Sequence, residues 1–70
     1  MIRESVNSSN LRSVGYDSDQ LTLEIEFHES GIYQYFGVQE QVFKGLISAQ
    51  SIGSFFNKDI KDIYRYTKTR

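Results

Sequence analysis

Residues 21–38, LTLEIEFHESGIYQYFGV, decide the fold of this chain. The first half alternates apolar and polar side chains with the period of two that is typical of a strand with one buried face. A second, aromatic-rich run over residues 32–38 follows the short segment Glu29-Ser30-Gly31, and a glycine supplies the positive φ that a tight turn requires. The pattern therefore predicts an antiparallel hairpin.

A two-residue loop at Ser30 and Gly31 sets the register that we predict for this hairpin. On the core face this loop pairs Phe27 with Gln34, Ile25 with Phe36 and Leu23 with Val38. The outer face of the hairpin then carries Glu24, Glu26, His28, Tyr33 and Tyr35. In this register the two tyrosines lie outside the core.

The segment before the hairpin predicts one more strand, over residues 9–16, with Val14 and Tyr16 facing inward, opposite Leu23 and Leu21. Residues 17–20, Asp-Ser-Asp-Gln, form the connecting turn, because aspartate and serine side chains hydrogen-bond nearby main-chain amides. Gly15 inside this strand indicates a bulge or the close approach of another backbone.

After Val38 the apolar period becomes that of a helix. The first helical stripe consists of Val42, Phe43, Leu46, Ile47 and Ala49. Ser51 is expected to cap a second, short helix that ends near Asn57 and buries Ile52, Phe55 and Phe56. Helical spacing continues through Ile60, Ile63 and Tyr64.

These elements predict an α+β fold: a three-stranded antiparallel β-meander followed by one helix and a short C-terminal helical segment packed on one face. Residues 1–8 are polar and lack periodicity, so we interpret them as an N-terminal lead-in to a single domain over residues 9–70. The chain has 70 residues and no cysteine, which excludes a disulfide framework and a thiolate metal site. No apolar run approaches the ~18 residues that span a bilayer, and we expect a soluble, cytoplasmic protein without membrane partners.

The chain resembles the KTSC family over residues 6–66, nearly the whole domain. Four groups of residues carry the resemblance: Ser8-Ser9-Asn10-Leu11 with Val14-Gly15-Tyr16-Asp17, Leu23 to Phe27, Gly31 to Tyr35 with Val38, and a helical set of Val42, Phe43, Leu46, Ala49, Ser51, Gly53, Phe55, Phe56, Asn57, Ile60 and Tyr64 to Tyr66. The family usually has a proline where this chain has Gln39. Its members occur at the C-terminus of some lysyl-tRNA synthetases and as small free-standing bacterial or phage proteins. The resemblance implies a fold and an association with RNA-handling proteins, and it supplies no catalytic residues.

Catalytic and metal-binding patterns are weak. Glu24, Glu26 and His28 alternate on one predicted strand face, but side chains two residues apart start nearly 7 Å from each other, so a solvated strand face is the better interpretation. A Ser-His-Asp triad would have to recruit the single histidine, and the scattered glycines make no phosphate-binding loop. We therefore predict a protein that is not an enzyme, with no metal and no cofactor.

Charge is segregated along the chain although the net charge is only −1. No basic residue occurs between Asp17 and Glu40, whereas the C-terminal end is rich in lysine and arginine. Cations beside planar rings are what a nucleotide or single-stranded RNA requires. The predicted ligand-binding residues are Lys58, Lys61, Tyr64, Arg65 and Tyr66, in a non-catalytic module for a phosphate-bearing ligand.

Two other interpretations of the same residues stay open. In the first, the C-terminal end is only a solvated charged tail. In the second, the module binds protein instead of a phosphate-bearing ligand. In that case, the strand face bearing Tyr33 and Tyr35 joins copies of this chain or docks on a host protein, and a homo-oligomer could hold a nucleotide between its subunits.

Overall fold

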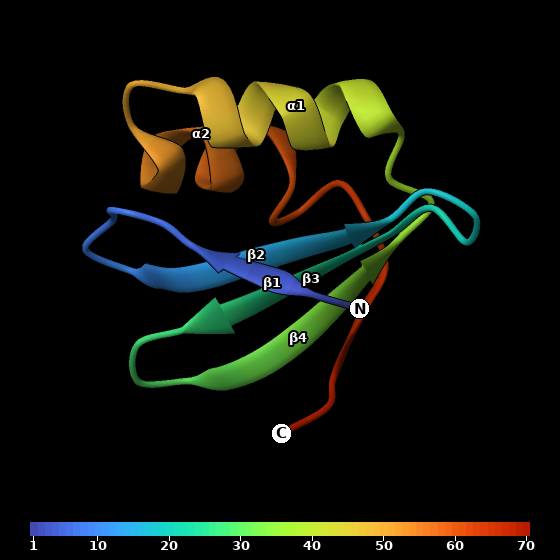
Figure 1. The fold of residues 1–70 in the computed structure, drawn as a ribbon, viewed down its shortest axis with the longest axis horizontal. Coiled ribbons are helices and arrows are strands. Elements are labelled where there is room, and N and C mark those ends of the chain that lie inside the picture. Colours follow the sequence, from blue (N-terminus) through green and yellow to red (C-terminus); the bar gives the residue numbers. More distant parts are fainter.

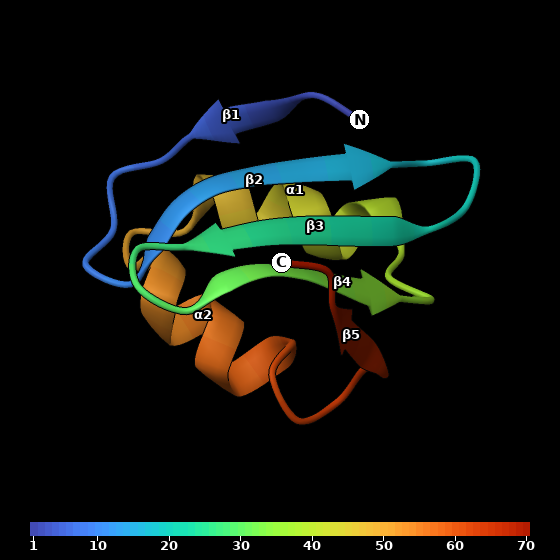
Figure 2. The same ribbon diagram turned by 90° about the horizontal axis from the view of Figure 1, so that it is seen from below.

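The computed structural model describes residues 1–70 as five strands and two helices. In chain order they are β1 (Arg3–Ser5), β2 (Leu11–Asp17), β3 (Thr22–Phe27), β4 (Gly31–Phe36), α1 (Glu40–Ser48), α2 (Ile52–Asp59) and β5 (Tyr66–Lys68). The strands form one antiparallel sheet in the order β1-β2-β3-β4-β5. Both helices cover the same face of this sheet (Figures 1 and 2). The α+β class is confirmed, but the predicted three-stranded meander is only the centre of a five-stranded sheet.

The first additional strand, β1, lies within residues 1–8. It pairs with β2, with Glu4 opposite Val14. A Cβ atom at Gly15 would stand 2.7 Å from the main-chain oxygen of Ile2. The close backbone approach that Gly15 indicates is therefore confirmed. Because Gly15 has no Cβ atom, the main chain at Ile2 can lie against β2 and β1 can pair with it.

The second additional strand, β5, lies beyond the predicted short C-terminal helical segment, which is present as α2 but is shorter than its apolar stripe suggests. The helix α2 ends at Asp59, two residues beyond the predicted end at Asn57, and Ile60 is fully buried. The apolar stripe then fails, because Ile63 is 62% exposed. A helix has no buried face to maintain beyond that point, and the chain turns back to pair Tyr66 with Tyr35 along the free edge of β4.

The central hairpin has a different register from the predicted one. Residues 28–30 form the turn and Phe27 pairs directly with Gly31, so Ile25 lies opposite Tyr33 and Leu23 opposite Tyr35. Such a shift by an odd number of residues exchanges the two faces of a strand. Tyr33 and Tyr35 therefore face the helices, and the prediction that they lie on the outer face is wrong.

Burial explains why this register forms. It places the large ring of Tyr35, which is only 4% exposed, in the apolar core, and burial of aromatic area is a main source of folding free energy. Gln34 moves to the outer face, where its side-chain amide donates to Glu24 at 2.9 Å.

The strand β2 also pairs two residues away from its expected register, with Val14 opposite Ile25 and Tyr16 opposite Leu23. An even shift preserves the faces, and both side chains still point inward as predicted. In the following turn, the Asp17 carboxylate accepts main-chain bonds from Asp19 and Gln20 at 3.0 and 3.3 Å. The predicted turn chemistry is thus confirmed.

The core lies between the sheet and the two helices. Its nine buried members are Leu11, Val14, Leu23, Ile25, Tyr35, Val38, Leu46, Phe56 and Ile60. The predicted first helix is confirmed, although Ile47 is 40% exposed instead of buried. Ser51 caps α2 as predicted, because its hydroxyl accepts from the main-chain amide of Ser54 at 3.3 Å. Neither helix has the length and apolar character that a bilayer crossing requires.

Candidate functional site

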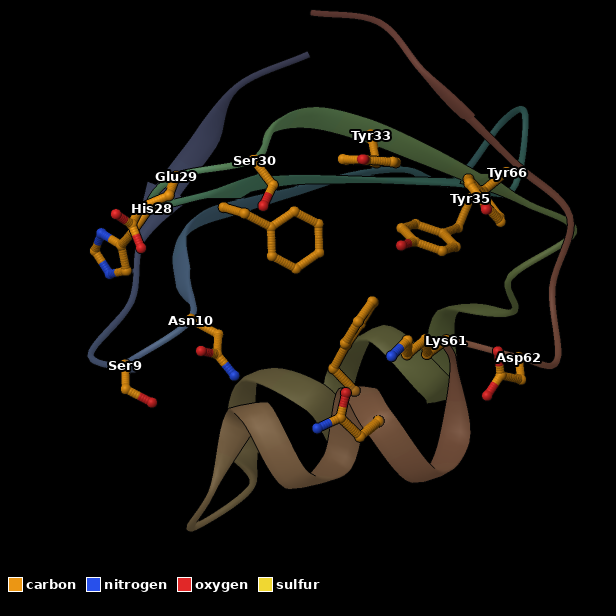
Figure 3. Close-up of a pocket in the computed structure, with 13 residues that line it drawn as sticks. Ser9, Asn10, His28, Glu29, Ser30, Tyr33, Tyr35, Lys61, Asp62 and Tyr66 are labelled. Carbon is orange, nitrogen blue, oxygen red and sulfur yellow. The ribbon is translucent and has the colours of Figure 1, made fainter.

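A pocket of about 390 Å³ opens between the sheet and α2, next to the core. Five aromatic side chains from four elements line it: Phe27 of β3, Tyr33 and Tyr35 of β4, Phe56 of α2 and Tyr66 of β5. They meet because the observed hairpin register puts both β4 tyrosines on the helix side of the sheet. Figure 3 shows the labelled tyrosines along one wall, with α2 forming the opposite wall.

The aromatic rings hold one another in place. Phe27 packs edge-on against Tyr33, with ring centroids 5.4 Å apart, and Tyr35 packs edge-on against Phe56, also at 5.4 Å. Tyr66 lies 5.8 Å from Tyr33 and 5.5 Å from Tyr35. Edge-to-face and tilted contacts at these distances are favourable, so the rings stabilise one another as one aromatic wall.

Tyr35 is the most buried of the polar residues that line the pocket. It is 4% exposed, and its hydroxyl oxygen has no hydrogen-bond partner within the protein. Burial, with smaller contributions from Tyr33 and Tyr66, raises the pKa of Tyr35 to about 12. The hydroxyl therefore stays protonated at neutral pH, and Figure 3 shows it pointing into the cavity.

Polar side chains surround the aromatic wall, and they differ in direction. The ammonium group of Lys61, the amide of Asn10 and the hydroxyl of Ser30 point toward the cavity (Figure 3). The carboxylates of Glu29 and Asp62 point away from it. The interior is therefore supplied with donors, while the acidic groups lie at its margin.

His28 also borders the pocket but turns its ring outward (Figure 3). One ring nitrogen of His28 lies 3.0 Å from the main-chain oxygen of Ser8. This contact joins the hairpin turn to the loop that carries Asn10. His28 therefore holds the edge of the pocket in place, and its ring does not enter the cavity.

The five residues that the sequence predicts as a ligand site are only partly gathered here. Lys61 and Tyr66 line the pocket. Lys58 and Arg65 are exposed close by in sequence, and none of the C-terminal lysines or arginines forms an ion pair. Tyr64 instead lines a separate shallow hollow with Val42, Phe55 and Ile63.

Sequence reasoning misses Asn10, Phe27, Ser30, Tyr35 and Asn57 as pocket-lining residues. The predicted register puts Tyr35 on the wrong face of the hairpin, and Asn10 and Asn57 come from a loop and a helix whose proximity depends on tertiary structure. The Gly31 turn is the only local signal that could have changed the register.

On the outer face of the sheet, Glu24 and Glu26 belong to a structural network rather than a metal site. The Arg3 guanidinium donates to Glu24 at 2.6 Å and to Ser13 at 3.1 Å, and the Ser13 hydroxyl donates to Glu26 at 3.0 Å. Burial alone would raise the pKa of Glu24, but hydrogen bonds from Gln34 and Arg3 and the Arg3 charge hold it below its ordinary value. The structure does not bring Glu24, Glu26 and His28 together around one point.

Fold and site together define a small α+β domain with an aromatic pocket. The KTSC domain family model matches residues 7–64, and this chain belongs to that family. It superimposes on the crystal structure of a KTSC domain protein from Yersinia pestis with a TM-score of 0.97 and 43% identity, covering 99% of this chain and 97% of that one.

Two kinds of relative appear among the similar sequences. An uncharacterized protein of Stutzerimonas stutzeri is 43% identical over 67 residues, which are 94% of each chain. The lysine–tRNA ligase of Nostoc punctiforme is 36% identical over 58 residues, which are 83% of this chain but only 10% of the ligase. The family therefore includes small free-standing proteins and a segment of a much larger enzyme.

Proposed function

We propose that this chain is a non-catalytic binding module for a phosphate-bearing ligand, RNA or a nucleotide, and that the aromatic pocket receives this ligand. The observation that carries the proposal is the Lys61 ammonium group, which points into an aromatic cavity and has no carboxylate partner. A planar wall with a free cation matches a base and its neighbouring phosphate.

The remaining C-terminal cations suit the phosphate part of such a ligand. Lys58 and Arg65 are exposed and unpaired, and each directly adjoins a pocket-lining residue, Asn57 or Tyr66, in the chain. Lys68 places its ammonium nitrogen 5.9 Å from the centre of the Tyr33 ring. Lys61 and Lys68 thus hold positive charge beside the aromatic rings, which suits a ligand with a sugar-phosphate backbone.

Similarity to a segment of larger enzymes supports the proposal in a second way. A segment similar to this chain occurs within proteins named lysine–tRNA ligase, and such an enzyme handles tRNA. A small module that binds a nucleotide unit is useful both as a separate protein and as an appendage of that enzyme.

The test is fluorescence anisotropy with a labelled single-stranded RNA of mixed sequence, measured over a series of salt concentrations. Changing Lys58→Gln together with Arg65→Gln is expected to weaken binding and to lower the slope of log affinity against log salt by about 0.7 for each phosphate that the variant no longer neutralises. Lys44→Gln serves as the control, because it removes one positive charge, half of the change in the double variant, from α1, where Lys44 lies 4.0 Å from Glu40. Unchanged affinity and slope in the double variant would contradict the proposal.

A protein-interaction or homo-oligomerisation role is the second candidate. Its support is the exposed apolar surface beside α2, where Ile63 is 62% exposed and borders the hollow that contains Val42, Phe55 and Tyr64. The strand face of Tyr33 and Tyr35 no longer serves this role, because both rings face the helices. Sedimentation velocity separates the candidates: a strict monomer at high concentration opposes self-association, whereas an Ile63→Ser variant that loses an observed dimer supports it.

A further inference from the structure

We infer that the pocket accepts a single nucleobase and prefers the keto bases guanine and uracil to the amino bases adenine and cytosine. This inference rests on the proposed function and specifies its ligand. Three properties of the pocket carry it: its size, the hydrogen-bonding character of its interior, and the position of its acidic residues.

The size of the pocket limits what enters. A volume of about 390 Å³ is near the lower end of the range for small-molecule sites. It accommodates one base with part of its sugar, but not a stack of several bases. The five aromatic rings provide the planar and apolar surroundings that a base requires. A longer RNA would therefore insert one unstacked base and leave the rest of its chain outside.

The hydrogen-bonding groups in the interior are hydroxyl and amide groups and one cation. The Tyr35 hydroxyl opens onto the cavity and has no hydrogen-bond partner within the protein, so it can donate to a ligand atom or accept from one. The Lys61 ammonium group is a donor only, and it points into the same cavity (Figure 3). Asn10 and Ser30 offer both a donor and an acceptor.

A group that can only donate, such as the Lys61 ammonium group, distinguishes the bases by one exocyclic group. Guanine presents the acceptors O6 and N7, and uracil presents O4, whereas adenine and cytosine present an amino group at the corresponding position. An amino group would place its hydrogens against the Lys61 ammonium group. A carboxylate could reverse this preference, but Glu29 and Asp62 point away from the cavity (Figure 3).

The experiment is isothermal titration calorimetry of the whole 70-residue protein with GMP, UMP, AMP and CMP. Ribose 5-phosphate and inorganic phosphate are titrated as probes without a base. The keto nucleotides are expected to bind about tenfold more tightly than the amino nucleotides, as the loss of one hydrogen bond to a charged donor implies. Ribose 5-phosphate should bind more weakly than any nucleotide.

Two variants test the assigned donors. Tyr35→Phe removes one oxygen and keeps the ring, and Lys61→Gln removes the charge from an exposed residue. Lys61→Gln should weaken GMP and UMP binding about fivefold to tenfold and change AMP and CMP binding little, whereas Tyr35→Phe should weaken the binding of all four nucleotides. Lys44→Gln is the matched charge control. Circular dichroism melting verifies that Tyr35→Phe is folded, and Lys61→Gln gives an independent answer if it is not.

The outcomes separate this inference from the function on which it rests. Equal affinity for all four nucleotides, a preference for AMP or CMP, or equal binding of ribose 5-phosphate would overturn the base preference and leave phosphate binding intact. RNA binding without any mononucleotide binding would overturn the single-base pocket in the same way. No binding of either RNA or nucleotides would overturn both. A comparison of UMP with an oligouridylate then identifies whether the free nucleotide or the base within a strand is the better ligand.

Discussion

The main-chain oxygen of Arg70 occupies the space beside Gly31 where any other residue would carry its Cβ atom. Gly31 also has a φ of +94°, which L side chains rarely adopt. The amide of Ile32 donates to the Arg70 oxygen at 3.2 Å, and the Thr69 amide donates to the Ile32 oxygen at 2.8 Å. The last residues of the chain are thus held against the start of β4, and this contact requires a glycine.

Gly31→Ala should therefore destabilise the fold more than Gly37→Ala does. Gly37 has a comparable φ of +76°, but no atom lies within 4 Å of the position of its Cβ. Gly37→Ala should cost only the conformational strain, about 1 kcal/mol, and Gly31→Ala should cost this strain and the displacement of the C-terminus. Urea unfolding measures both free energies. In a chain that lacks residues 69–70 the two costs should become equal, and a difference that persists there would show that the C-terminal contact is not its cause.

The same hairpin shows how far local sequence determines this fold. Alternation over residues 21–27 is sufficient to predict β3 and its buried face, and the change to helical spacing after Val38 is sufficient to predict α1. The register is not determined locally. It depends on the packing of Tyr35 against Phe56 and on the path of the C-terminus past Gly31, contacts between residues more than twenty positions apart. The two edge strands also depend on tertiary pairing with β2 and β4, since neither has an apolar pattern of its own.

The network on the outer face predicts how stability responds to acid. The pKa of Glu24 in the folded protein lies below its ordinary value of 4.5, so the unfolded chain takes up a proton at a higher pH than the folded one. The stabilisation from Glu24 is therefore fully present above pH 4.5 and is lost as the pH falls through the folded pKa. In urea unfolding at several pH values, Glu24→Gln should show a flatter acid limb than the wild type.

Arg3→Ala provides a matched test of that network. It should lower the free energy of unfolding by about 1 to 2 kcal/mol at neutral pH, because Glu24 loses a charged donor at 2.6 Å. The effect should shrink when Glu24→Gln is already present. Equal effects of Arg3→Ala in the two backgrounds would mean that Arg3 acts through its packing on β2 and not through Glu24.

The candidate site is less predictable from the sequence than the fold is. Charge segregation points to Lys61 and Tyr66, and both line the pocket. Tyr64 does not line it, because its place in the chain brings it to the other side of α2. The pocket interior is beyond local reasoning, since Asn10, Tyr35 and Asn57 lie on three elements that only the tertiary structure brings together.

Two helical glycines give opposite expectations for the same substitution. A Cβ at Gly53, near the start of α2, meets nothing closer than 3.7 Å, whereas a Cβ at Gly45 in α1 would stand 2.8 Å from the Phe55 ring. Gly53→Ala should stabilise the protein by about 0.5 to 1 kcal/mol through helix propensity. Gly45→Ala should lose this gain because the Phe55 ring must move. Thermal and urea unfolding of the two variants measure the difference, and equal stabilisation would show that Phe55 yields without cost.

Tyr35 predicts how stability responds to alkali. Because its pKa rises to about 12 in the folded protein, the unfolded chain releases the hydroxyl proton near pH 10 while the folded chain retains it. The stabilisation is therefore complete below pH 10 and is lost as the pH rises toward 12.

Tyr16, whose pKa burial also raises, contributes in the same direction, so the comparison must be made against the wild type. In urea unfolding from pH 9 to pH 12, Tyr35→Phe should lose less stability than the wild type, whereas Tyr66→Phe should behave nearly like it, because Tyr66 is 58% exposed. Parallel curves for Tyr35→Phe and the wild type would mean that burial does not raise the pKa of the Tyr35 hydroxyl in the folded protein.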